Sequence, residues 1–436
     1  MAHRISQGFV LAFHCISEDI EPAIEKFWRQ LRSRLQEQGQ ELLLISTFPV
    51  IDRELPFLEI PFYLPDFYTQ NYQLPIAAVN PQMVKILQDW YDLPQERAMN
   101  VYTSVMDFMQ HLLDALQPAA VLSWQGANPM SRMVRAICLS RDIAWWATER
   151  GWIRNTLMFD LCDNNVLSEV NRSLISQRAM ATFRPSERLC REIRKRILVA
   201  ESVARYPISE SNTITPLRER LGLSPETSIW VLFTHGEPHV MASSEQVRSA
   251  HQMDAVGLQK CLSQLSATLS ARGSVLLVRE HPANRASGRE LNLHGLSNVH
   301  LHEGDLDELF SVADVGLFTL STLQFEWALR GKPFGLLCSG MLSGENMAPQ
   351  WTKYDDTNDF VNDCLDEEKW VDRHIEIERR IAYLYVSQLV DLSPACLEHS
   401  AQEIATLLVM HSGAELTKAV NGLNSFIRGF KKEVQL

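Results

Sequence analysis

The sequence has no long apolar run. No stretch of about 18 or more consecutive apolar residues occurs in the 436 residues, so we expect no membrane-spanning segment. The opening stretch MAHRISQGFVLAFHC holds one short apolar run that soon reaches His14, too polar and too short for a secretory signal, so we expect a first strand there. Basic charge is also in deficit. A net charge of −12 argues against nucleic acid as the main partner, but it leaves room for a local basic pocket for one phosphate.

The 8 cysteines contain no C-x-x-C pair, so we expect no zinc site of the usual spacing. In a long chain, scattered cysteines of this kind are typical of reduced, buried side chains, which favours the cytoplasm. Hydrophobic residues at 46% and charged residues at 22% are ordinary for a soluble globular protein. The length predicts two to three domains with sizeable cores.

Short apolar runs alternate with segments of helical periodicity, which predicts parallel sheets covered by helices. The alternation breaks at a segment rich in Pro, Ser and Thr after residue 206 and then restarts. Residues 50–80, rich in Pro, Phe and Tyr, are predicted as a long insertion. The fold class is therefore α/β, with two doubly wound Rossmann-like halves. The predicted parts are a first domain over 1–205, a linker over 206–225, a second domain over 226–380 and a helical tail over 381–436.

In sheets of this kind, ligands bind outside the carboxyl ends of the strands, and a cleft between two halves suits two substrates. Four strand ends of the second half could line that cleft. The stretches are FTHGEPH with His235, Gly236, Glu237 and His239; REHP with Arg279, His281 and Pro282; HEGD with Glu303 and Asp305; and FTLSTLQFE with Ser321, Thr322 and Glu326.

Ser321 and Thr322 stand where a strand gives way to a helix. Such residues cap free backbone N–H groups, and the same groups can bind an anion; a plain helix cap is the alternative. Glu326, one turn later, could accept hydrogen bonds from a ribose, or it could be a solvated helix residue. In the neighbouring REHP stretch, Pro282 fixes the backbone after His281, so the imidazole could face the same phosphate. Arg279 would add charge there, although strand alternation also allows it to point away.

In the first half, the apolar run IAWWATE ends at Glu149. A carboxylate beside tryptophans can have a raised pKa, which suits a general acid or base; an ion pair with Arg150 or Arg154 is the alternative. Gly126, in the stretch SWQGANP, stands at a strand–helix turn where a backbone can approach a ligand closely, or where a tight turn simply needs glycine.

Together these segments resemble the bacterial capsule-synthesis β-Kdo glycosyltransferases, which use CMP-Kdo. TERGWIRN is similar to the family's EDGFxRS, REHP to its KPHP, STLQFEWALRGKP to its S-x-x-GxEAL-x-GKP, and ARYP to its sKYN. The resemblance spans roughly residues 119–340, and a more distant likeness extends to bacterial CMP-sialic-acid transferases.

The resemblance implies a GT-B fold, with CMP held by the C-terminal half, the acceptor held by the N-terminal half, and no metal or other cofactor. It implies that His281, Ser321 and Thr322 hold the phosphate, that Glu326 holds the ribose, and that Glu149 is the acid/base. The same motifs place Arg279 and Pro282 beside the nucleotide and Arg154 and Gly151 beside the sugar or acceptor; Gly126, His235 and Gly236 are further substrate-side candidates from their positions at strand ends.

The sequence departs from the family at the loop after the first strand of the second half. There the family carries an acidic residue in a GQxExD-like loop, whereas this chain reads THGEPHVMAS. The aligned position is His239 and the nearest carboxylate is Glu237, so both are candidate catalytic residues. The stretches ERG and GLLCSGMLSG also differ from the family's forms, which leaves the sugar and the retaining mechanism open.

We therefore expect a cytoplasmic CMP-sugar glycosyltransferase of surface-polysaccharide synthesis that transfers Kdo or a related ulosonic acid to a glycan or glycolipid. The alternatives are a transferase that uses CMP-sialic acid or a UDP- or GDP-sugar, and a non-catalytic sugar-binding subunit of a capsule assembly machine. The basic and aromatic stretch NSFIRGFKKEVQL fits either peripheral contact with the inner membrane or a packed terminal helix.

Overall fold

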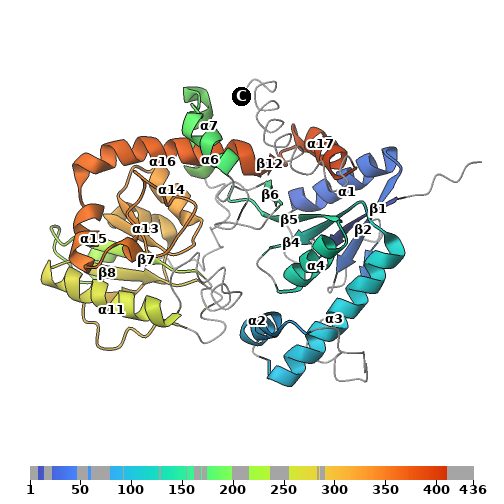
Figure 1. Ribbon diagram of the computed structural model, residues 1–436. Helices are drawn as coiled ribbons and strands as arrows, with labels where there is room; N and C mark the ends of the chain where they lie inside the picture. The colour runs from blue at the N-terminus through green and yellow to red at the C-terminus, as the bar shows by residue number, and fades with distance from the viewer. Residues whose placement is uncertain are drawn as a thin grey trace, which may run out of the picture. The chain divides into compact units, whose positions relative to one another are not determined.

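The chain forms two compact units, one made of Met1–Gln177 with Leu384–Leu436 and the other of Arg178–Tyr383. Figure 1 shows the computed structural model. The structure describes residues 8–13, 22–46, 57–59, 79–91, 93–126, 129–153, 155–161, 168, 174–198, 216–235, 255–281, 284 and 290–409.

The first unit is built on a seven-stranded sheet in the order β12-β6-β5-β4-β1-β2-β3. β1 to β5 are parallel to one another, whereas β6 pairs antiparallel with both β5 and β12. The strands are β1 (Gly8–Phe13), β2 (Gln40–Ser46), β3 (Phe57–Glu59), β4 (Ala120–Trp124), β5 (Ala144–Arg150), β6 (Thr156–Asp160) and β12 (Leu389–Asp391).

Helices cover both faces of this sheet (Figure 1). On one face, the apolar stripes of α2 (Pro81–Tyr91), α3 (Gln95–Leu116) and α4 (Pro129–Ser140) pack on inward residues of the strands, among them Trp145. On the other face, α1 (Pro22–Glu37) lies beside α17 (Leu397–Val409). None of the helices among the described residues is both long and apolar enough to cross a membrane.

The second unit is built on a five-stranded parallel sheet in the order β11-β10-β7-β8-β9. Its strands are β7 (Ile229–Phe233), β8 (Val275–Arg279), β9 (Val299–Leu301), β10 (Val315–Phe318) and β11 (Phe334–Leu336). The helical elements of the second unit are α6 (Leu174–Thr182), α7 (Glu187–Arg196), α8 (Leu217–Arg220), α11 (Ala255–Ala271), α13 (Leu306–Val312), α14 (Leu323–Leu329), the short 3₁₀ turn η4 (Trp351–Lys353), α15 (Thr357–Cys364) and α16 (Glu367–Gln388). α6 begins shortly before this unit, and α16 continues beyond it into the first unit.

In both sheets the first strand of the unit lies in the interior of the sheet, and the later strands lie on both sides of it. In the second unit, β7, β8 and β9 run one way from the centre, and β10 and β11 lie on the other side of β7. This is the doubly wound strand order, whose switch point lies between the first and fourth strands. The predicted α/β class with two doubly wound, Rossmann-like halves is therefore confirmed.

The compact units differ from the predicted domains in two places. The division falls after Gln177 rather than at 206–225, a stretch of which 206–215 lies outside the described residues. The predicted tail, 381–436, is not purely helical, because its β12 joins the first sheet beside β6 and its α17 packs on α1. The reason is that α16 carries the chain back to the first unit, where the buried residues Leu389 and Val390 complete the sheet edge.

Candidate functional site

Three strand ends meet at the switch point of the second unit. β10, β7 and β8 are parallel neighbours, so the residues that follow them lie along one sheet edge. Backbone hydrogen bonds hold these ends in register: Thr319 N–H donates to the Phe233 carbonyl at 3.3 Å, and Thr234 N–H donates to the Arg279 carbonyl at 3.1 Å. The structure thus brings together the FTH, REH and FTLST stretches, as the sequence predicts.

Two histidines form the centre of this edge. His235 follows β7 and His281 follows β8, and their ring centroids lie 5.4 Å apart with the ring planes tilted by 60°. The His281 N–H donates to Thr234 Oγ1 at 2.9 Å, and Asn284 Nδ2 donates to the His235 carbonyl at 2.8 Å. Asn284 is not among the site residues predicted from the sequence; its only local signal is its place three residues after His281.

Burial sets the charge of the first histidine. It lowers the pKa of His235 to about 4, although part of the residue's surface remains exposed. His235 is therefore neutral near pH 7. A neutral imidazole donates through one ring nitrogen and accepts through the other, so it can hydrogen-bond to a phosphate oxygen without carrying charge.

Arg279 contacts the neighbouring strand end. Its Nη1 donates to the carbonyls of His302 at 3.3 Å and Gly304 at 2.9 Å, which lie in the connection from β9 to α13. The guanidinium thus fixes the loop beside the site. Its predicted part in nucleotide binding stays a prediction.

The β10–α14 connection carries Ser321 and Thr322, both partly exposed. Ser321 Oγ accepts a hydrogen bond from Leu323 N–H at 3.3 Å. Thr322 is the N-cap residue of α14, but within the described part of the chain its side chain caps none of the helix N–H groups. The alternative of a plain helix cap therefore fits Ser321 and does not fit Thr322.

Glu326 is buried in α14, with its side chain 1% exposed. Its Oε1 accepts a hydrogen bond from Arg330 Nη2 at 2.8 Å, one turn along the helix. The alternative of a solvated helix residue is therefore wrong. A buried carboxylate in the first turn of α14 is compatible with a ribose contact, and that role stays a prediction.

The ERG stretch of the first unit forms a β-hairpin. β5 extends through Glu149 to Arg150, and Glu149 pairs with Met158 of β6. The Gly151 N–H donates to the Thr156 carbonyl at 2.9 Å, and a Cβ on Gly151 would lie 1.9 Å from Thr156 Oγ1. The close approach of the two chains therefore requires glycine here, independently of any substrate.

Gly126 is buried in the turn between β4 and α4, at the switch point of the first sheet. The residue before it, Gln125, takes a left-handed conformation with φ 58°, and its N–H donates to the Thr148 carbonyl at 2.8 Å. The predicted strand–helix turn at Gly126 is confirmed, and the hydrogen bond of Gln125 holds this turn against β5.

Five of the predicted site residues lie outside the described residues: Arg154, Gly236, Glu237, His239 and Pro282. Their roles stay predictions. Within the described ranges, no group of three or more His, Cys, Asp or Glu is placed to hold a metal ion.

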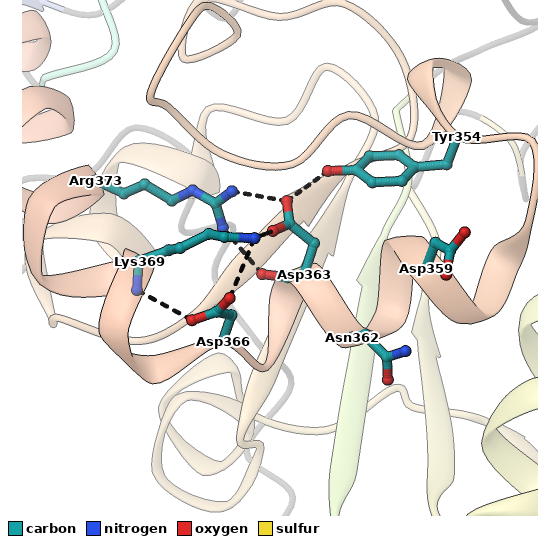
Figure 2. A pocket seen from close by; sticks show the side chains of 7 residues that line it. All are labelled: Tyr354, Asp359, Asn362, Asp363, Asp366, Lys369 and Arg373. Atoms are coloured by element: carbon teal, nitrogen blue, oxygen red, sulfur yellow. Dashed lines mark hydrogen bonds and ion pairs between the residues drawn. The ribbon is translucent and has the colours of Figure 1, made fainter.

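A separate polar hollow of about 420 Å³ lies where α15 meets α16 (Figure 2). At its centre, Asp363 accepts hydrogen bonds from Tyr354 Oη at 2.5 Å, Lys369 Nζ at 2.6 Å and Arg373 Nη2 at 2.7 Å. Burial raises the pKa of Asp363, but these donors outweigh it and hold the pKa below its usual value. The charges satisfy one another, which indicates a structural network that joins the two helices.

No protein-family model and no curated protein matches the sequence. Among solved structures, the chain is similar to KpsC β-Kdo 2,4 transferase of Thermosulfurimonas dismutans, at 16% sequence identity, covering 51% of this chain and 69% of that chain, with a TM-score of 0.35. It is also similar to KpsC β-Kdo 2,7 transferase of the same organism, at 12% identity, covering 63% of this chain and 81% of that chain, with a TM-score of 0.37. It is also similar to the UDP-GlcNAc 2-epimerase of Neisseria meningitidis, at 11% over 93% and 100% with a TM-score of 0.32. The fold assignment above rests on strand order and not on these matches.

Proposed function

We propose that the chain is a glycosyltransferase of bacterial surface-polysaccharide synthesis that takes Kdo, or a related ulosonic acid, from a CMP-sugar. The observation that carries the proposal is the meeting of His235, His281 and Ser321 at the carboxyl ends of three adjacent parallel strands, at a switch point. These ends carry the donors that a phosphate needs. The choice of CMP and of Kdo comes from the resemblance of the motifs.

In this proposal the second unit holds the nucleotide. The imidazole of His281 and the hydroxyls of Ser321 and Thr322 bind the phosphate, and Glu326 accepts from the ribose. Hydrogen bonds from these groups to the phosphate stabilise the negative charge that develops on it as it leaves. No metal is expected in this scheme.

The first unit holds the acceptor, a glycan or glycolipid. Glu149 is the general acid or base, and Gly126 and Gly151 line the acceptor side. The resemblance of the motifs assigns Arg154 to the sugar carboxylate, and it makes Glu237 and His239 of the second unit candidate catalytic residues. The acceptor places the protein at the cytoplasmic face of the inner membrane, in contact with the lipid surface or with capsule assembly proteins.

A second function is favoured by one specific feature. The loop THGEPHVMAS has His239 where the family has an acid, so the chain could bind a nucleotide sugar without transferring it. Such a chain would be a sugar-binding subunit of the assembly machine.

The first experiment is calorimetric titration of the full chain with CMP, UDP and GDP in the absence of metal. Selective binding of CMP is the expected result. Preference for UDP or GDP would support a phosphate site at the strand ends and contradict the CMP-sugar assignment. Binding of none would contradict the nucleotide site itself.

The second experiment measures release of CMP from CMP-Kdo with candidate acceptors. The variant Glu149→Gln should lower the rate by about 10²–10⁴-fold, the contribution of a general acid or base, while CMP affinity is unchanged. Glu96→Gln, an exposed residue of α3 in the same unit, is the matched control. CMP binding without turnover in the unmodified chain would favour the binding subunit.

A further inference from the structure

The ladder between β7 and β8 ends in an unusual way. Among the residues that the structure describes, its last backbone hydrogen bond runs from Thr234 N–H to the Arg279 carbonyl at 3.1 Å. Beyond that point, side chains contact the backbone of both histidines. The His281 N–H donates to Thr234 Oγ1 at 2.9 Å, and the His235 carbonyl accepts from Asn284 Nδ2 at 2.8 Å. Two side chains therefore extend the pairing of the strands to both histidines.

The sequence after His281 explains why side chains are needed. The next residue is a proline, which has no N–H and cannot continue a ladder. Instead, the Asn284 N–H donates to the His281 carbonyl at 3.0 Å. Asn284 thus contacts His281 with its backbone and the end of β7 with its side chain.

The two residues whose side chains make these bonds are buried: Thr234 is 4% exposed and Asn284 is 3% exposed. Water therefore does not compete for these bonds, and the loss of one partner would leave the other unsatisfied. Because the bonds act on the His281 amide and the His235 carbonyl, they fix the backbone from which each imidazole projects. The 5.4 Å between the ring centroids is only a little more than the spacing of adjacent strands, about 4.8 Å.

We propose that Thr234 and Asn284 are positioning residues that hold His235 and His281 as one pair on a single phosphate group of the nucleotide. A phosphate oxygen lies about 2.7–3.2 Å from each donor that contacts it, and a phosphate presents several oxygens. Two rings at this separation can therefore contact one phosphate at the same time. This inference rests on the proposed function and deepens it by adding His235 to the phosphate contacts and by naming the two residues that position the pair.

The test uses the full chain and three variants. Thr234→Val keeps the shape of the side chain and removes the hydroxyl, Asn284→Leu keeps roughly the size of the side chain and removes the amide donor without adding charge, and Thr234→Ser restores the hydroxyl. For each, we would measure CMP affinity by calorimetry, the pKa of His235 by NMR, and thermal unfolding to establish that the variant is folded.

We expect Thr234→Val and Asn284→Leu each to weaken CMP binding by about tenfold, because each should cost one hydrogen bond from a histidine ring to the charged phosphate. Thr234→Ser should bind within about threefold of the unmodified chain. In Asn284→Leu, the pKa of His235 should rise from about 4 toward the ordinary value of 6.5, as its ring gains access to water.

Three results would count against the inference or its premise. Folded variants with unchanged CMP affinity would overturn it, even if their thermal stability were lower. An unmodified chain that binds no nucleotide would overturn the proposed function instead. In that case the NMR measurement tests the positioning by itself, because a His235 pKa that stays near 4 in Asn284→Leu would show that Asn284 does not position the ring.

Discussion

The clearest mechanical prediction concerns Gly151, where β5 turns toward β6. An alanine Cβ at this position would lie 1.9 Å from Thr156 Oγ1, 2.9 Å from Thr156 Cβ and 3.1 Å from Leu389 Cδ2. The first two distances are far shorter than any van der Waals contact. The variant Gly151→Ala can therefore fold only if Thr156 or the hairpin backbone moves.

Such a movement has a cost that can be worked out from the contacts of Thr156. The residue is 1% exposed, and its hydroxyl donates to the Ile153 carbonyl at 2.6 Å. Rotating the hydroxyl away forfeits this bond, at about 1 kcal/mol, and overpacking a buried position costs about 1–3 kcal/mol more. We therefore expect Gly151→Ala to lower the free energy of unfolding of the first unit by about 2–4 kcal/mol.

The assay is urea unfolding followed by tryptophan fluorescence, performed as a double-mutant cycle. Thr156→Gly removes both close atoms, so alanine at position 151 should cost at least about 1 kcal/mol less in that background. An alanine penalty below about 0.5 kcal/mol, or one that is equal in both backgrounds, would refute the steric explanation. The glycine of the ERG stretch would then have to be explained by a ligand contact.

Three further predictions concern the second unit. His281→Ala should weaken CMP binding by about tenfold in calorimetry, whereas the exposed control His294→Ala should not; equal affinities would contradict the phosphate contact. Lys332→Met should lower stability by about 1–3 kcal/mol in urea unfolding, because Lys332 Nζ donates at 2.6 Å to the carbonyls of Phe310 and Ala313 at the end of α13; the exposed Lys353→Met is its control. Stability should fall as the pH drops from about 6.5 toward 4, because the unfolded chain binds a proton on His235 that the folded chain, with a His235 pKa near 4, does not bind. The loss from this residue is at most about 3 kcal/mol, and His235→Gln should remove it. Parallel pH profiles of the unmodified chain and the variant would contradict the lowered pKa of His235.

The local pattern predicted most of what builds the second sheet. β7, β8 and β10 are short, fully apolar runs that end in polar residues, and helical segments separate them. Parallel pairing follows from that alternation. The sequence alone therefore predicts that the residues at these strand ends lie along one edge of the sheet.

The edge of the first sheet could not be predicted in this way. β6 is five residues long and β12 only three, and the two pair although more than 200 residues separate them in the chain. Neither carries a turn or a period that identifies its partner. The hairpin that requires Gly151 was hidden for the same reason, since the motif alone does not reveal how close Thr156 lies.

The sequence by itself determined the α/β class, the positions of the central strands, and the residue types at their carboxyl ends, because these depend on local apolar runs and on residues close in the chain. Only the tertiary structure decided that His235 lies beside His281, that Asn284 contacts a carbonyl 49 residues away, and that Glu326 is buried. These features depend on strand order, which brings distant segments within hydrogen-bonding distance. A hydrogen bond between such segments leaves no periodic signal in either of them, so it becomes visible only once the sheet is assembled.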